Sequence, residues 1–385
     1  MKILKAEFIY EIPTKVYFGE NKLNNLGEEL EKFGKNVLLV YGGGNIKKTG
    51  LYNRVVDYIN EKELNLFEIS GIEPNPRYTS VNSGVKICKD NRIDVILAVG
   101  GGSVIDAAKL MALGTFYDGD SWDIISAGVK PPKALPVVTI LTLAATGSEM
   151  DAKAVISNIY TNEKMSIKTP LIYPKVSFLD PSNTYSVDWF QTACGSADIV
   201  SHVLESYFAP QEDLEILDRF MEGIIETVIK YAPIALDEPD NYDARANLMW
   251  ASSWAINGFI EGSKKHRWTC HAMEHELSAF YDITHGLGLA IVTPSWMEYV
   301  LDKSTEDKFS ILGERVFGVK TAKETIEKFK DFFYNTLGLP DKLSKVGIDE
   351  NNFKLMAGKA CRGKTLKGFT ELEKEDIEKI FYMCK

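Results

Sequence analysis

Residues 95–109 read VILAVGGGSVIDAAK, and this stretch decides the fold class of the first half of the chain. A continuous apolar run ends in three glycines, and a helical pattern begins after one serine. Continuous runs of β-branched residues are typical of parallel strands that are covered on both faces. A strand, a tight glycine turn and a helix in this order predict one βα unit of a doubly wound α/β domain.

The same order occurs a second time, in VLLVYGGGNIKKTG (37–50). Helical patterns at 51–63 and 79–91 separate apolar runs that are bounded by Gly, Pro or Asn. These runs predict buried strands at 36–41, 64–69, 94–100, 135–141 and 175–180. We therefore expect a Rossmann-like α/β domain over residues 1–186.

The pattern changes after LDPSNTYSV (179–187), where strand-like runs almost disappear. One clear helix is predicted within TAKETIEKFKDFFYNTLGLP (321–340), because Thr321 and Glu324 suit a capping box and Gly338 ends the pattern. Similar segments follow one another to the end of the chain. We expect an all-helical second domain over residues 187–385.

Composition narrows the class of protein. The chain has 385 residues, is 45% hydrophobic and 25% charged, and carries a net charge of −10. This charge argues against nucleic acid or an acidic membrane surface as a partner. The N-terminus lacks the apolar core of a signal peptide, and the five cysteines form no CxxC pair. We expect a soluble protein of the cytoplasm with reduced thiols.

The two glycine turns suggest a nucleotide site. Glycine lets the backbone approach a phosphate closely, and the amides that open the next helix bind it. Neither turn matches GxGxxG, and a pair of tight turns without a ligand is the alternative. Two such turns in one α/β domain favour a nucleotide at the carboxyl ends of the strands. A third segment after a predicted strand, TLAATGSEMD (142–151), offers hydroxyl groups.

Four of the five histidines can be grouped with one carboxylate. Asp198 and His202 are four residues apart, as are His271 and His275, so each pair shares a helix face. His285 follows shortly after. Isolated histidines of this kind are more often core residues with satisfied hydrogen bonds. Four histidines in two short helical motifs, with a carboxylate in register, favour a metal site.

The spacing excludes a zinc protease and favours a catalytic metal. HExxH is absent, because Ala272 follows His271 and Ala279 stands where the second histidine would be. No cysteine pair has the spacing of a structural zinc site. Imidazole and carboxylate ligands suit Fe(II), Zn(II) or Mn(II).

Four motifs together resemble the iron-containing (group III) alcohol dehydrogenases. They are GGGSVIDAAK (100–109), TLAATGSEMD (142–151), GSADIVSHVLE (195–205) and CHAMEHELSAFYDITHG (270–286). The butanol dehydrogenase branch, which includes NADPH-dependent aldehyde reductases, is the most similar, and the resemblance covers essentially the full chain. It implies an α/β dinucleotide-binding domain, a following all-α metal-binding domain and a homodimer.

The resemblance also implies roles for individual residues. The metal ligands would be Asp198, His202, His271 and His285, with His275 beside the metal as a catalytic residue in the substrate pocket or a proton relay. The cofactor-binding positions would be Gly42, Gly43, Gly44, Asn45, Asn75, Gly100, Gly101, Gly102, Ser103, Asp106, Thr142, Thr146 and Lys164.

The implied activity is that of a metal-dependent alcohol dehydrogenase or aldehyde reductase. Hydride would pass between NAD(P)(H) and a short-chain primary alcohol or aldehyde such as butanol or butyraldehyde, with Fe(II) or Zn(II) polarising the substrate oxygen. NADP(H) is favoured over NAD(H), because no carboxylate stands at Tyr41 or Gly42 and because Asn45, Lys47 and Lys48 suit a 2′-phosphate.

Two other functions compete with this one. A carbon–oxygen lyase or cyclase on the same scaffold, as in dehydroquinate synthases, would need a basic pocket, for which Lys264, Lys265 and Arg267 are the candidates. A nucleotide-binding protein without catalysis is the other alternative, and the complete ligand set argues against it.

Overall fold

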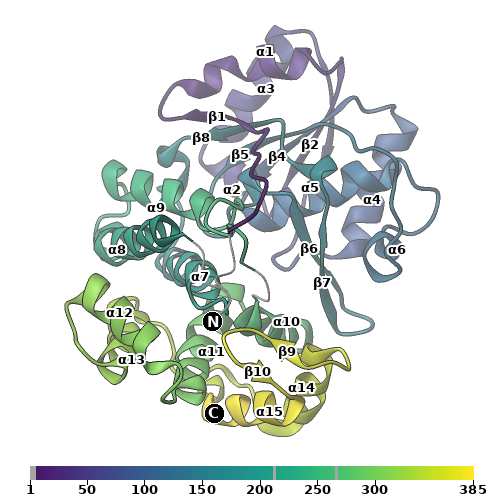
Figure 1. Ribbon diagram of the computed structural model, residues 1–385. Coiled ribbons are helices and arrows are strands. Elements are labelled where there is room, and N and C mark those ends of the chain that lie inside the picture. Colours follow the sequence, from purple (N-terminus) through teal and green to yellow (C-terminus); the bar gives the residue numbers. More distant parts are fainter. Residues whose placement is uncertain (1–5, 211–213, 265–267) are drawn as a thin grey trace. The chain divides into compact units, whose positions relative to one another are not determined.

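The computed structural model describes residues 6–210, 214–264 and 268–385 (Figure 1). These residues form two compact units. The sheet unit consists of Glu11–Val187 with Pro239–Ser253. The helical unit consists of the described parts of Met1–Tyr10, Asp188–Glu238 and Trp254–Lys385. The chain leaves the sheet unit next to the boundary expected at residue 186.

A six-stranded parallel sheet is the centre of the sheet unit, with the strand order β1-β8-β5-β4-β2-β3. The five strands predicted from apolar runs are confirmed, with ends that differ by at most two residues. The strands of this sheet are β1 (Lys15–Phe18), β2 (Asn36–Tyr41), β3 (Asn65–Ile69), β4 (Val95–Gly100), β5 (Val137–Leu141) and β8 (Val176–Leu179). The helices of the unit are α1 (Leu26–Glu31), α2 (Asn45–Lys48), α3 (Leu51–Glu61), α4 (Tyr78–Asp90), α5 (Gly102–Gly114), α6 (Ser121–Ser126) and α9 (Tyr242–Trp254), and short 3-10 turns lie at Lys22–Asn25, Ser148–Met150, Pro170–Ile172 and Pro181–Thr184.

Two apolar cores cover the two faces of this sheet. Successive side chains of a strand point to opposite faces, so Val37 and Leu39 of β2 pack with α1 and α3, whereas Leu38 and Val40 pack with α4 and α5. Burial of each such aliphatic side chain stabilises the folded state by about 1.5–3 kcal/mol relative to leaving it exposed to water. Because both faces of the central strands are buried, β2, β4 and β5 are apolar at nearly every position, which is the pattern that identified them in the sequence.

Three strands of the sheet unit escaped the sequence analysis. The edge strand β1 is partly exposed, and β6 (Lys153–Asn158) and β7 (Glu163–Lys168) form a separate antiparallel hairpin between β5 and β8. Strand β7 contains both exposed and buried positions, and three of its residues are charged. The apolar runs that mark buried parallel strands are therefore missing here.

Helix α9 belongs to the sheet unit, although its position in the sequence lies within the expected helical domain. Met249 of α9 joins the core of α4 and α5, Trp250 packs edge-on against Phe18 of β1, and Ser253 donates a hydrogen bond to Glu149. A helical pattern alone does not show on which unit a helix packs, so only the tertiary structure could make this assignment.

The helical unit follows the all-helical expectation except for one short hairpin, β9 (Leu366–Lys367) with β10 (Glu371–Leu372). The predicted capping box of Thr321 and Glu324 is confirmed at the start of α13. The helix ends in a π-helical turn over Asp331–Thr336. The helices of this unit are α7 (Trp189–Tyr207), α8 (Glu215–Asp237), α10 (Thr269–Tyr281), α11 (His285–Val300), α12 (Glu306–Phe317), α13 (Ala322–Lys330), α14 (Phe353–Cys361) and α15 (Lys374–Met383), with 3-10 turns at Leu343–Val346 and Glu350–Asn352.

Two further expectations concern the whole described chain. All five cysteines are buried free thiols, as the lack of a CxxC pair predicted. Among the described helices, none combines the length and the apolar character that crossing a membrane requires.

The buried Glu149 predicts a pH dependence of stability. Burial raises the pKa of its carboxyl group from 4.5 to about 7, so the folded protein holds the proton more tightly than the unfolded chain does. This stabilisation is complete below pH 4.5 and is lost as the pH rises through 7. Glu149→Gln keeps an acceptor for Ser253 and removes the ionisation. Its advantage over the wild type in unfolding free energy should grow by about 2.5 kcal/mol between about pH 5 and 8.

Urea unfolding at each pH measures this difference. Glu61→Gln, on the exposed surface of α3, is the control for the loss of a surface carboxylate. If the stability curves of the wild type and Glu149→Gln run parallel over this pH range, the assignment is wrong.

Candidate metal centre and nucleotide loops

Helix α7 carries the first two predicted metal ligands. Asp198 and His202 lie one turn apart on a face that is buried, and Nδ1 of His202 lies 3.5 Å from Oδ1 of Asp198. Nearly the whole helix is buried, and these two polar residues alternate along it with buried apolar residues such as Ile199 and Val203. Charged and polar groups in such a position need partners of their own.

Helix α10 supplies the third ligand. The ring of His271 stacks on the ring of His202, with centroids 4.7 Å apart. Glu205 of α7 fixes the start of α10, because its carboxylate accepts hydrogen bonds from the backbone N–H groups of Cys270 and His271. A carboxylate at a helix N-terminus also interacts favourably with the helix dipole. The register of His271 against His202 is therefore held by a contact between the two helices.

The fourth ligand stands at the first residue of α11. Nε2 of His285 lies 3.8 Å from Oδ1 of Asp198. The next residue is Gly286, and a Cβ atom there would overlap the backbone carbonyl of Cys194 in α7. Only glycine lets α11 come this close to α7, and this approach brings His285 to Asp198.

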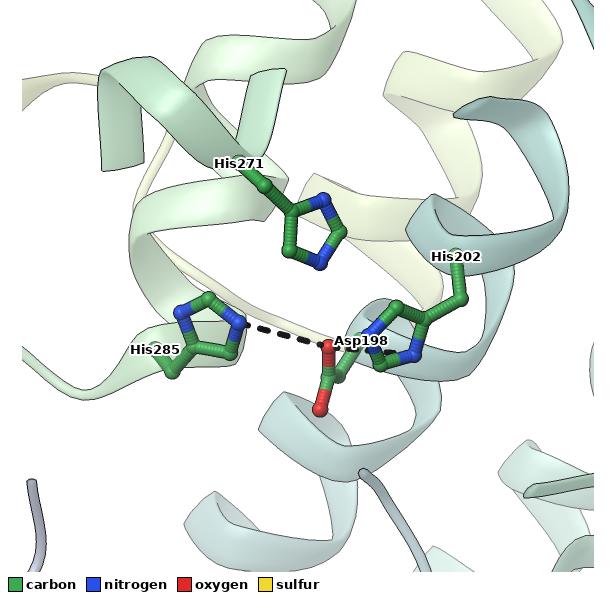
Figure 2. A group of neighbouring side chains, drawn as sticks. All are labelled: Asp198, His202, His271 and His285. Carbon is green, nitrogen blue, oxygen red and sulfur yellow. Dashed lines mark ion pairs between the residues drawn. The ribbon is translucent and has the colours of Figure 1, made fainter. Parts of the chain in front are cut away.

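Figure 2 shows the four side chains converging, with Asp198 between His202 and His285 and with His271 above them. Each offers one ligand atom, and these four atoms all lie within 4.8 Å of one another. Nε2 of His271 is buried and has no hydrogen-bond partner among the described residues. Three imidazoles and one carboxylate are ligands that Fe(II) and Zn(II) accept at about 2.0–2.2 Å. The residues present therefore fit a divalent metal ion.

Trp268 packs beside two of these ligands. Its ring lies edge-on to His202 and to His271, with centroid distances of 5.8 and 4.9 Å. It precedes α10 with a φ of 75°, which is the left-handed region that bulky residues rarely adopt. No local sequence pattern marks a left-handed tryptophan, so this backbone conformation was not predicted.

His275 lies beside the four-residue group and is half-buried. Its ring centroid is 5.7 Å from that of His285 and 6.4 Å from that of His271. It is therefore close enough to face a molecule bound at the metal, and its catalytic role stays a prediction.

In the sheet unit, both glycine turns lie at the topological switch point. The chain runs from β2 outward to β3 and then returns to place β4 on the other side of β2. Ligands of open α/β sheets bind in the crevice at the carboxyl ends of such neighbouring strands. The turn Gly42–Gly44 follows β2, the turn Gly100–Gly102 follows β4, and Thr142 after β5 donates its backbone N–H to the carbonyl of Gly100. The three predicted segments therefore lie side by side.

Two of these glycines are required by close packing or conformation. A Cβ atom at Gly102 would overlap the side chain of Thr146, so two predicted cofactor positions are in direct contact. Gly44 precedes α2 with a φ of 95°. Ser103 lies in the first turn of α5, where unpaired backbone N–H groups suit a phosphate.

Asp106 turns toward the protein interior. Its carboxylate accepts hydrogen bonds from Ser148 Oγ at 2.6 Å and from the N–H of Val155 at 2.9 Å, and burial raises its pKa to about 6. It therefore ties the 142–151 segment and β6 to α5. Its contact with the cofactor stays a prediction.

A buried lysine next to Asp106 escaped the sequence analysis. The Lys109 ammonium donates to Ser148 Oγ at 2.9 Å, to Oδ1 of Asp151 at 2.6 Å and to the carbonyls of Asp151 and Lys153 at 3.0 and 2.8 Å. A buried cation with one carboxylate and three further acceptors meets the requirement for burying charge. The motif GGGSVIDAAK thus contains an anchor for the 142–151 segment.

Asn75 and Lys164 are both buried in the sheet unit. Lys164 of β7 is paired with Ser157 of β6, and Ser157 forms a bridge with Arg77. The hairpin therefore brings Lys164 toward the segment that contains Asn75, which has a φ of 49°. The cofactor contacts of both residues stay predictions.

Comparison with known proteins agrees with this geometry. Residues 13–181 match the family model of iron-containing alcohol dehydrogenases, and residues 192–384 match the C-terminal model of the same family. The chain is 49% identical to the NADH-dependent butanol dehydrogenase A of Clostridium acetobutylicum, over 97% of this chain and 98% of that protein. It is 38% identical to the NADPH-dependent aldehyde reductase YqhD of Escherichia coli, over 89% of each chain.

A solved structure is similar over nearly the whole length. The crystal structure of an NADH-dependent butanol dehydrogenase A from Thermotoga maritima has a TM-score of 0.94, with 38% identity and coverage of 98% of both chains. The resemblance drawn from the four motifs and the predicted fold class are confirmed. The protein belongs to the iron-containing alcohol dehydrogenase family.

Proposed function

We propose that the protein reduces short-chain aldehydes such as butyraldehyde, and oxidises the corresponding primary alcohols, with a nicotinamide cofactor. The metal and nicotinamide dependence follow from the family. The observation that carries the proposal is the group of Asp198, His202, His271 and His285, which matches the donor set of a catalytic divalent metal. Relatives named as butanol dehydrogenases support the substrate class.

Different residues bind the metal, bind the cofactor and transfer the proton. Asp198, His202, His271 and His285 would hold a divalent metal, which supplies Lewis-acid polarisation of the substrate oxygen. The glycine turns of the sheet unit bind the pyrophosphate of the cofactor through backbone N–H groups. We assign to the half-buried His275 the proton that an aldehyde oxygen gains on reduction.

One of the three cations that the lyase alternative requires is engaged within the protein. A phosphorylated acid needs accessible cations, but Lys264 is buried and its ammonium lies 3.3 Å from Oδ1 of Asp218. The other two candidates, Lys265 and Arg267, lie outside the described residues.

We also propose NAD(H) as the preferred cofactor, which reverses the expectation from the sequence. The Lys47 ammonium lies over the rings of Tyr41 and Tyr52, at 5.2 and 4.6 Å from their centroids. The hydroxyl groups of both tyrosines donate to Glu68, at 3.0 and 2.6 Å. Hydrogen bonding to Tyr41 and the field of Glu68 raise the pKa of Lys47.

These contacts bear directly on a 2′-phosphate. Lys47 packs over two tyrosine rings whose hydroxyl groups donate to Glu68, and Asn45 donates to Ser186 Oγ at 2.9 Å. Two of the three groups expected to receive the phosphate are thus engaged within the protein. The name of the NADH-dependent relative at 49% identity supports the same preference.

Chelation and two histidine variants test the activity. The wild type should oxidise NADH in the presence of butyraldehyde, and this activity should disappear on removal of the metal and return with Fe(II) or Zn(II). His271→Ala should lose both bound metal and activity. His275→Ala should keep the metal and lose about 100-fold or more in kcat, which is the usual scale of a lost proton donor.

Elemental analysis and steady-state kinetics measure the two effects separately. A His271→Ala protein with full activity would refute the metal assignment. A His275→Ala protein that lacks metal would make His275 a ligand rather than a proton donor.

The cofactor proposal has its own test. Glu68→Gln removes the nearby negative charge that acts on Lys47, so the ratio of kcat/KM for NADPH to that for NADH should rise roughly fivefold. Asp57→Asn, on the exposed side of α3, changes the net charge equally and should leave the ratio unchanged. A wild type that prefers NADPH would contradict the proposal.

We propose a homodimer as the assembled form. Strand β1 is the edge of the six-stranded sheet and pairs only with β8 among the described strands, so its other side offers backbone groups to another strand. Sedimentation equilibrium should give about twice the chain mass of 43.1 kDa. A mass equal to that of one chain would contradict the proposal.

A further inference from the structure

Glu274 lies directly behind the metal ligands without belonging to the four-residue group. It stands on α10, three residues after His271, and is completely buried. One carboxylate oxygen contacts Nδ1 of His285, and the other accepts a hydrogen bond from Ser278 Oγ. Its two oxygens therefore face two partners, of which one is a predicted metal ligand.

The neighbouring helix leaves room for this carboxylate. A Cβ atom at Gly288 of α11 would lie 2.8 Å from Cγ of Glu274 and 3.1 Å from its Oε1. The sequence HGLG (285–288) thus uses its two glycines differently. Gly286 lets α11 approach α7, and Gly288 accommodates Glu274 against α11.

The contact determines which nitrogen of His285 faces the ligand group. A carboxylate accepts hydrogen bonds, so Nδ1 carries the hydrogen and Nε2 keeps its lone pair. Nε2 is the nitrogen that lies 3.8 Å from Asp198. An imidazole held in this way presents its lone pair in a fixed direction and is a stronger electron donor.

We propose that Glu274 is a positioning residue that holds His285 in the orientation and tautomer required for metal binding. The inference rests on the proposed metal site. Ser278 supports it by fixing the second oxygen of the carboxylate, and the space at Gly288 makes the arrangement possible. Loss of such a partner typically weakens metal binding about 10–100-fold.

Metal titration of the purified, metal-free full-length protein tests the proposal. Competition between the protein and a chromophoric chelator for Zn(II) gives the Kd, and the visible spectrum of the Co(II)-loaded protein reports the ligand geometry. Glu274→Ala should raise the Kd about 10–100-fold and change the Co(II) spectrum. Glu274→Gln keeps an oxygen that accepts from Nδ1–H, so its Kd should lie between those of the wild type and Glu274→Ala.

Three controls separate the possible outcomes. Glu298→Gln, an exposed position on α11, should bind Zn(II) like the wild type. Circular dichroism of the metal-free variants shows whether they fold. If Glu274→Ala does not fold, Glu274→Gln tests the proposal, because glutamine has nearly the same shape as glutamate. His271→Ala sets the Kd expected when a ligand is lost.

Two results would overturn the inference. Wild-type affinity in both Glu274 variants would show that His285 needs no such partner. A loss in Glu274→Gln as large as in His271→Ala would make Glu274 a ligand itself, as its grouping with His275 and His285 would also allow. If the wild type binds neither metal, the proposed function fails instead, so the two failures are distinguishable.

Discussion

The close approach of α11 to α7 at Gly286 is the constraint on which the metal centre depends. The distance between two packed helices is set by the side chains at their crossing, and it is smallest where one residue has no side chain. Gly286 faces the backbone carbonyl of Cys194, four residues before Asp198. The residue before this glycine, His285, is therefore brought to the carboxylate of Asp198. A larger residue at 286 would separate the helices and with them the ligands.

Three buried carboxylates surround the imidazoles in this unit. Asp198 lies among the ligands, Glu205 holds the N-terminus of α10, and Glu274 contacts His285. Burying several negative charges together is unfavourable in a medium of low dielectric constant unless donors and cations compensate them. A divalent ion at the four-residue group supplies such compensation. The same electrostatic logic explains why Glu205 and Glu274 each follow a ligand histidine by three residues, on the same helix face.

The sheet unit also buries charged groups, and there a lysine compensates a carboxylate. Lys109 and Asp151 form an ion pair at 2.6 Å, and Asp106 holds Ser148 and the start of β6. These contacts join the helix that follows one glycine turn to the segment that follows β5. The loops expected to carry the cofactor are therefore held in place by buried charged groups.

The sequence by itself determined the parts of this protein that depend on local patterns. Apolar runs predicted the buried parallel strands, the glycines after β2 and β4 predicted the turns at the switch point, and the four-residue spacing of Asp198 and His202 predicted a shared helix face. Tertiary structure decided what depends on contacts between distant residues: the unit on which α9 packs, the packing of Lys47 over Tyr41 and Tyr52, and the placement of Glu274 behind His285. Local spacing encodes backbone geometry over one or two turns, whereas these contacts arise only when helices and strands far apart in the chain are packed together.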